Sequence, residues 1–173
     1  CDIKAEARTR FVQEFATDSF KVVPYERIED ACKEADIIIT ITTANAPLIR
    51  EAWCKPGCLV LTMGSYTETH DDVPLSFDSI YLDSMEQGLH RGNLKEIAER
   101  GLITADNIAA ELPYVVTGAE SGRTKEHQRI LCELVGMGST DLAVAAQVLQ
   151  RIEAQKNAPL KIDMMNGQVC LPS

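Results

Sequence analysis

Apolar residues recur along the chain with two different spacings. In residues 4–15 they stand at Ala7, Phe11 and Phe15, which is the spacing of an amphipathic helix. Residues 36–42 instead form a run with apolar side chains on both faces, and such runs are typical of parallel strands covered by helices. Further strands are predicted at residues 21–23, 58–63, 79–82 and 128–135.

Helical patterns lie between these strands. Further helices are predicted at residues 29–35, 84–91, 94–100, 108–116 and 140–155. Asp106 is expected to cap the helix at 108–116, in which Pro113 must cause a kink or an early end. Ser139 or Thr140 is expected to cap the last helix, and the tail from Asn157 is expected to be irregular. The alternation of strands and helices predicts an α/β fold with a mainly parallel sheet and flanking helices.

The predicted strands are followed by small, flexible or polar residues. Among them are Thr42 and Thr43, Gly64 and Ser65, and Val135 and Gly136. In an open parallel sheet the ligand lies beyond the carboxyl ends of the strands, and short side chains there let a nucleotide approach the backbone. Ordinary turns of α/β domains are rich in the same residues, and composition alone favours that simpler interpretation.

Asp2 stands just before the first predicted helix. An acid at the end of the second strand of a dinucleotide-binding fold holds the ribose hydroxyls of NAD, and Asp2 would suit that role. The alternative is an N-cap for the helix. The glycine-rich G-x-G-x-x-G turn would lie about 20 residues earlier, before Cys1. Because the chain does not begin with Met, we expect it to be the C-terminal part of a larger protein.

Composition and charge narrow the kinds of partner. The 173 residues are 45% hydrophobic and 25% charged, as expected for one globular domain. The net charge of −9 argues against nucleic acid or an anionic membrane surface as a partner. No apolar stretch reaches the roughly 20 residues that span a bilayer. Cys54 and Cys58 lack a histidine pair at the spacing of a zinc site, so we expect no bound metal. Several cysteines stand inside apolar runs, so we expect buried thiols and a cytoplasmic location.

Four stretches of the chain resemble one family, in that family's order. They are ADIIITITTANAPLIREAWCKPGCLVLTMGSYTETHDDVP, IYLDSMEQGL, AAELPYVVTGAESGRT and ELVGMGSTDLAVAAQVL. The likeness to the ornithine cyclodeaminase and mu-crystallin family runs from Asp2 to about Ala154. It implies a partial Rossmann domain at residues 1–155 that binds NAD, with NADP as the alternative. Residues 156–173 would be a tail packed on a second, N-terminal domain that lies before Cys1.

The resemblance also implies roles for particular residues. Asp2 would hold the adenosine ribose, and Thr42 and Thr43 would line the adenine and ribose side. The residues near the nicotinamide would be Gly64, Ser65, Val135 and Gly136.

Tyr66 departs from the family pattern. Members that convert amino acids carry an Asp two residues after the strand-ending glycine for acid/base chemistry, and Tyr66 occupies that position here. The resemblance therefore favours an imine reductase, which exchanges hydride with a small imino or amino acid, over a true ornithine cyclodeaminase. A non-enzymatic, crystallin-like nucleotide-binding protein is the alternative. The catalytic residues would lie before Cys1, and a homodimer would form through the missing N-terminal domain.

Overall fold

The structure is a computed structural model that describes residues 1–44, 46–154, 161–163 and 168–170. It divides into two compact units, Cys1–Val135 and Gly136–Ser173. The first unit holds the main sheet with its helices, and the second holds one long helix and a small hairpin.

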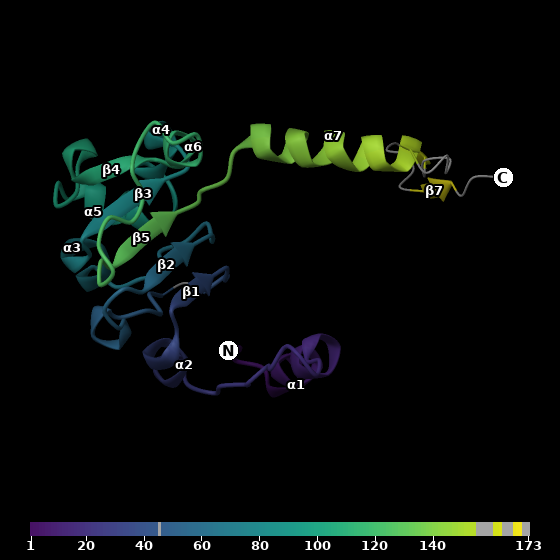
Figure 1. Ribbon diagram of the computed structural model, residues 1–173, viewed down its shortest axis with the longest axis horizontal. Helices are drawn as coiled ribbons and strands as arrows, with labels where there is room; N and C mark the ends of the chain where they lie inside the picture. The colour runs from purple at the N-terminus through teal and green to yellow at the C-terminus, as the bar shows by residue number, and fades with distance from the viewer. Residues whose placement is uncertain (45, 155–160, 164–167, 171–173) are drawn as a thin grey trace. The chain divides into compact units, whose positions relative to one another are not determined.

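A five-stranded sheet forms the centre of the first unit (Figure 1). Its strands are β1 (Ile37–Thr40), β2 (Leu59–Thr62), β3 (Ser79–Leu82), β4 (Ile108–Glu111) and β5 (Ile130–Glu133). They lie in the order β1-β2-β5-β3-β4, and every neighbouring pair is parallel. The predicted α/β fold with a parallel sheet is therefore confirmed.

Short helical segments connect the strands. They are α1 (Ala5–Phe15), α2 (Ile28–Glu34), η1 (Glu51–Trp53), α3 (Asp72–Ser76), α4 (Met85–Gly88), η2 (Gly92–Leu94), α5 (Lys95–Glu99), η3 (Ala105–Asn107) and α6 (Leu112–Val116). The helices predicted at 4–15, 29–35, 84–91 and 94–100 correspond to α1, α2, α4 and α5, with ends that differ by at most three residues. Such differences arise because helix ends fray.

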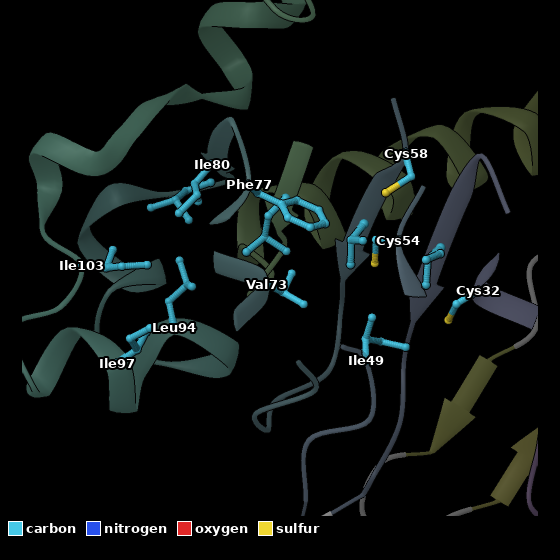
Figure 2. Close-up of a cluster of buried hydrophobic side chains, with 14 residues drawn as sticks. Cys32, Ile49, Cys54, Cys58, Val73, Phe77, Ile80, Leu94, Ile97 and Ile103 are labelled. Atoms are coloured by element: carbon cyan, nitrogen blue, oxygen red, sulfur yellow. The ribbon is translucent and has the colours of Figure 1, made fainter. Parts of the chain in front are cut away.

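Alternate residues of the strands belong to two hydrophobic clusters, one on each face of the sheet. The larger cluster contains Val60, Ile80 and Leu131 from the strands, and Figure 2 shows Val73, Leu94 and Ile97 among its members. The smaller cluster consists of Tyr81, Ile130 and Cys132, packed against partly buried residues that include two from α6. Each fully buried aliphatic side chain contributes about 1.5–3 kcal/mol to folding, so these clusters hold the strands in place.

Strand β1 lies at the edge of the sheet and is buried on one face only. Ile38 and Thr40 are buried, whereas Ile37 and Ile39 are 57% and 59% exposed. The expectation that this strand is buried on both faces is therefore wrong within the first unit. Both-face burial does hold for β5, whose four residues are all buried between β2 and β3.

Three further expectations are wrong, two of them because strand pairing overrides local pattern. Residues 108–116 are not one helix: Ile108–Glu111 is strand β4, which pairs with β3. Pro113 lies in the first turn of the following helix, where its missing N–H costs nothing. Thr104, rather than Asp106, caps the segment with Asn107. Residues 21–23 form no strand, because the sheet gives them no partner.

The second unit begins with helix α7 (Gly138–Ala154), which starts before the expected caps Ser139 and Thr140. It also contains the antiparallel pair β6 (Lys161–Asp163) and β7 (Gln168–Cys170), so the expectation of an irregular tail is wrong there. Within the described part of the chain, no helix has both the length and the apolar character to span a membrane.

Candidate functional site

The five strands end at the same level of the sheet. Because they are parallel and in register, Thr40 lies beside Thr62, and Thr62 lies beside Glu133. Beyond Glu133, the row continues through Leu82 to Glu111. The carboxyl edge of the sheet is therefore a row in which four of five residues are polar, and this edge is where open α/β sheets bind ligands.

Glu68 ties the ends of β1 and β2 together. Its side chain is 0% exposed and accepts three hydrogen bonds. The donors are Thr40 Oγ1 at 2.7 Å, the Thr42 backbone N–H at 2.7 Å and the Gly64 backbone N–H at 2.9 Å. A buried carboxyl group needs such partners, because leaving its oxygens unpaired would cost several kcal/mol. Glu68 therefore fixes the backbone where both strands leave the sheet.

Gly64 is required by this close approach. A Cβ atom built at Gly64 would lie 2.6 Å from the carboxyl carbon of Glu68, well inside van der Waals contact. Only a residue without a side chain lets the backbone N–H reach the carboxyl group at this distance. The glycine therefore serves the internal packing of the edge as well as any approach of a ligand.

Asn93, in η2, holds the loop that carries Glu68. Its Oδ1 accepts hydrogen bonds from the backbone N–H groups of Glu68 and Thr69, both at 2.8 Å. Its Nδ2 donates to Thr69 Oγ1 at 3.0 Å. Asn93 is buried, so these bonds form away from water, where an unmade bond is costly.

Glu133, at the end of β5, connects this loop to the middle of the sheet. Its Oε1 accepts from the Asn93 backbone N–H at 2.5 Å, and Thr62 Oγ1 lies 3.4 Å from its Oε2. Burial raises the pKa of Glu133 to about 8, although hydrogen bonds from the backbone of Asn93 and Leu94 oppose that increase. Its carboxyl group is therefore largely protonated at neutral pH.

Gly92 precedes Asn93 and has a φ of +71°, a conformation that favours glycine. A Cβ atom at Gly92 would collide with Oε1 of Glu133 and would lie 3.5 Å from Cγ2 of Val135. Val135, the second residue after β5, therefore lies next to η2. Hydrogen bonds and this contact join the exits of β1, β2 and β5 into one network, which we call the strand-exit network (Glu68, Asn93 and Glu133 with their partners).

A pocket of about 330 Å³ opens beside this network. It is lined by Pro47, Ser65, Tyr66, Thr67, Gly92, Lys95 and Glu96. Tyr66 is about half exposed, so its phenol can meet a ligand. Glu68 does not line the pocket, because its carboxyl oxygens already face the three donors inside the edge.

The structure brings together part of the predicted site. The backbone N–H groups of Thr42 and Gly64 both donate to the Glu68 carboxyl group. Ser65 and Gly92 both line the pocket, and Val135 lies next to Gly92. Thr43 is exposed beside Thr42.

Asp2 contacts the start of the first helix, and Gly136 belongs to the second unit. Asp2 Oδ1 accepts a hydrogen bond from the Lys4 N–H at 2.8 Å, but Lys4 rather than Asp2 is the N-cap of α1, so the N-cap alternative is wrong. Asp2 also lines a pocket of about 370 Å³ around α1. Gly136 is the first residue of the second unit and has a φ of +91°.

The pattern of the sequence did not point to Asn93 or to Glu133 as parts of the site. Glu133 had one available signal, since it is an acid that ends the apolar run Ile130–Cys132. Asn93 had none, because its partners lie 24 to 40 residues away. Among the described residues, no three His, Cys, Asp or Glu side chains are placed to hold a metal ion.

The model of the ornithine cyclodeaminase/mu-crystallin family matches residues 1–156 of the chain. An uncharacterized cyclodeaminase of Sinorhizobium fredii is 31% identical over 163 residues, which are 91% of this chain and 48% of that protein. The chain therefore spans about half the length of this curated relative.

Two solved structures are also similar. Delta(1)-pyrroline-2-carboxylate reductase of Thermococcus litoralis, in complex with NADH and L-proline, has a TM-score of 0.84 at 22% identity and covers 91% of this chain and 50% of its own. The iminosuccinate reductase of Paracoccus denitrificans, in complex with NAD⁺, has a TM-score of 0.69 at 27% identity and covers 76% of this chain and 41% of its own. Because this family model matches residues 1–156 of the 173 residues, the chain belongs to the ornithine cyclodeaminase/mu-crystallin family.

Proposed function

We propose that this protein is an NAD-dependent oxidoreductase of the imine reductase type, acting on a small imino or amino acid. One observation carries the proposal: the ends of β1, β2 and β5 meet in one network beside a pocket of about 330 Å³. This is the position at which dinucleotide-binding sheets hold their cofactor. The two similar reductases, which were solved with NADH or NAD⁺, support the same assignment.

The residues at this edge fit a dinucleotide. Thr42, Gly64 and Ser65 have short side chains or none, so a flat ring can approach their backbone. We assign Thr43 with Thr42 to the adenosine side. Gly64 and Ser65 are assigned to the nicotinamide side. A bound NAD would supply or accept the hydride.

Three more residues complete the proposed cofactor site. Asp2 is assigned to the adenosine ribose, because its carboxylate is exposed and lines the pocket around α1. This acid favours NAD, since it would repel the 2′-phosphate of NADP. Val135 and Gly136 are assigned to the nicotinamide side, because they follow Leu134, the first residue beyond β5.

The chemistry available at the pocket favours a reductase over a cyclodeaminase. Tyr66 stands where an acid/base Asp is expected, and the carboxyl group of Glu68 is occupied by Thr40, Thr42 and Gly64. A base must reach its proton within hydrogen-bond distance, and Glu68 does not face the pocket. Tyr66 can instead position a substrate through its hydroxyl group.

The domains outside this chain are proposed from the relatives, which are about twice as long. We propose that residues 1–155 form part of the dinucleotide-binding domain and that residues 156–173 pack on an N-terminal domain. That domain would add the remaining catalytic residues and the homodimer contact. The exposed Ile37 and Ile39 of β1 give it an apolar surface to cover. Free thiols at Cys32, Cys54, Cys58 and Cys132 are consistent with a cytoplasmic protein.

The test has two steps on the full-length protein. Titration with NADH and NADPH, followed by nicotinamide fluorescence, should show tighter binding of NADH. A cyclic ketimine acid, or pyruvate with a primary amine, should then cause the nicotinamide absorbance to fall. Failure to bind either nucleotide would overturn the proposal. Binding without turnover of any imine would instead identify a crystallin-like binding protein.

A further inference from the structure

Glu68 joins two loops at the carboxyl edge of the sheet. Its backbone carbonyl accepts hydrogen bonds from the Leu48 N–H at 2.8 Å and from the Ile49 N–H at 3.1 Å. Its carboxyl group accepts from the backbone N–H groups of Thr42 and Gly64. Leu48, Ile49 and Thr42 follow β1, whereas Gly64 and Glu68 itself follow β2. Glu68 therefore connects the exits of both strands through its backbone and its side chain.

The two carboxyl oxygens of Glu68 serve different halves of the proposed cofactor site. Oε1 accepts from the Thr42 N–H at 2.7 Å, and Thr42 is assigned to the adenosine side. Oε2 accepts from the Gly64 N–H at 2.9 Å, and Gly64 is assigned to the nicotinamide side. Oε2 also accepts from Thr40 Oγ1 at 2.7 Å, which fixes the carboxyl group against β1. One planar group therefore sets the spacing between the two halves.

This arrangement requires two acceptor atoms on one side chain. A backbone N–H can only donate, so each oxygen of Glu68 must accept. Glutamine has the same length, but its NH₂ group only donates. In either orientation of the amide, that NH₂ group would face a backbone N–H. Glu68 is 0% exposed, so water does not replace the lost bond.

The loop that Glu68 closes carries three residues of the pocket. Ser65, Tyr66 and Thr67 line the pocket of about 330 Å³ and stand between Gly64 and Glu68. The hydrogen bond from the Gly64 N–H to Glu68 Oε2 spans four residues and closes this loop at its base. A shift of the Glu68 side chain therefore moves the wall of the pocket relative to the end of β1.

We propose that Glu68 is a positioning residue that holds the adenosine side and the nicotinamide side of the site at the spacing that one NAD molecule spans. This inference rests on the proposed function. NAD binds as a bivalent ligand, because its two halves are covalently linked and each occupies one half of the site. Linked halves bind together only where the geometry lets both engage at once. Loss of the Glu68 carboxyl group should therefore weaken the whole dinucleotide much more than one half alone.

The test compares NADH with AMP, which carries only the adenosine half, on the full-length protein. Titration calorimetry measures both nucleotides on the wild type and on Glu68→Gln. In the variant, the dissociation constant of NADH should rise at least about tenfold, and that of AMP less than about threefold. Val73→Ala is the control for lost stability, because Val73 is 0% exposed in the larger hydrophobic cluster. It should change neither dissociation constant.

Thr40→Val is the second variant, and it decides the question where Glu68→Gln does not fold. It leaves both backbone N–H bonds to Glu68 and removes the hydroxyl group that holds Oε2. The dissociation constant of NADH should rise about threefold, with that of AMP unchanged.

The inference is overturned if the deciding variant binds NADH as tightly as the wild type does. It is equally overturned if NADH and AMP weaken by the same factor, because Glu68 would then act on the adenosine side alone. A wild-type protein that binds neither nucleotide overturns the proposed function itself, and this inference with it.

Discussion

Replacing Glu133 with Gln should remove a pH dependence of stability that this one carboxyl group creates. Its pKa is raised from 4.5 to about 8 by burial. The unfolded chain releases the proton near pH 4.5, whereas the folded protein holds it until about pH 8. Stability from this group is therefore full below pH 4.5 and is lost as the pH rises toward 8. Glutamine keeps the shape of the protonated group and has no proton to lose.

The size of the effect follows from the same values. A difference of about 3.5 in pKa, at about 1.4 kcal/mol for each pKa unit, sets a ceiling of about 5 kcal/mol on the loss. Between pH 5 and 7, the free energy of unfolding should fall by about 1 kcal/mol per pH unit in the wild type relative to the variant.

Urea denaturation of both proteins at intervals from pH 5 to 9 measures this difference. Glu120→Gln, at an exposed position, is the matched control and should run parallel to the wild type. If the Glu133→Gln protein also runs parallel to the wild type over the whole range, Glu133 ionises normally and the argument from burial is refuted.

Three other substitutions probe the site. Gly64→Ala should weaken NADH binding about tenfold in fluorescence titration, because its Cβ would displace the carboxyl group of Glu68; unchanged binding would contradict the proposed nicotinamide side. Asn93→Ala should lower the free energy of unfolding by about 2–4 kcal/mol in urea, since it leaves the buried N–H groups of Glu68 and Thr69 unpaired. Asp2→Ala should raise the NADH dissociation constant about tenfold with little change in melting temperature, and an equal effect on NADPH would refute the ribose assignment.

Much of the sheet could be predicted because its strands are continuous apolar runs. Strands β2, β3 and β5 lie within the predicted runs, since burial on both faces requires that composition. Strand β4 was not predicted, because Ile108–Glu111 contains two alanines and leads directly into a helical sequence. Only its pairing with β3 makes it a strand, and pairing with a distant segment leaves no local pattern.

The candidate site, like the sheet, could be predicted only in part. Parallel strands place their carboxyl ends at one edge, so the proximity of Thr42 and Gly64 follows from the strand pattern alone. The contacts that hold this edge do not follow from it. Glu68 reaches Thr40 across 28 residues, and Glu133 reaches Asn93 across 40. These contacts depend on the order of the strands, which sequence periodicity does not encode.

The strand order β1-β2-β5-β3-β4 has a consequence for how the molecule is made. Of the five strands in this sheet, β5 is synthesised last and is inserted between two earlier ones, so β1-β2 and β3-β4 exist only as separate pairs until Glu133 has been synthesised. Until then, the facing edges of β2 and β3 are open to other chains. A nascent chain stalled before Ile130 would therefore need a chaperone, and aggregation during synthesis should depend on whether Ile130–Glu133 has been made.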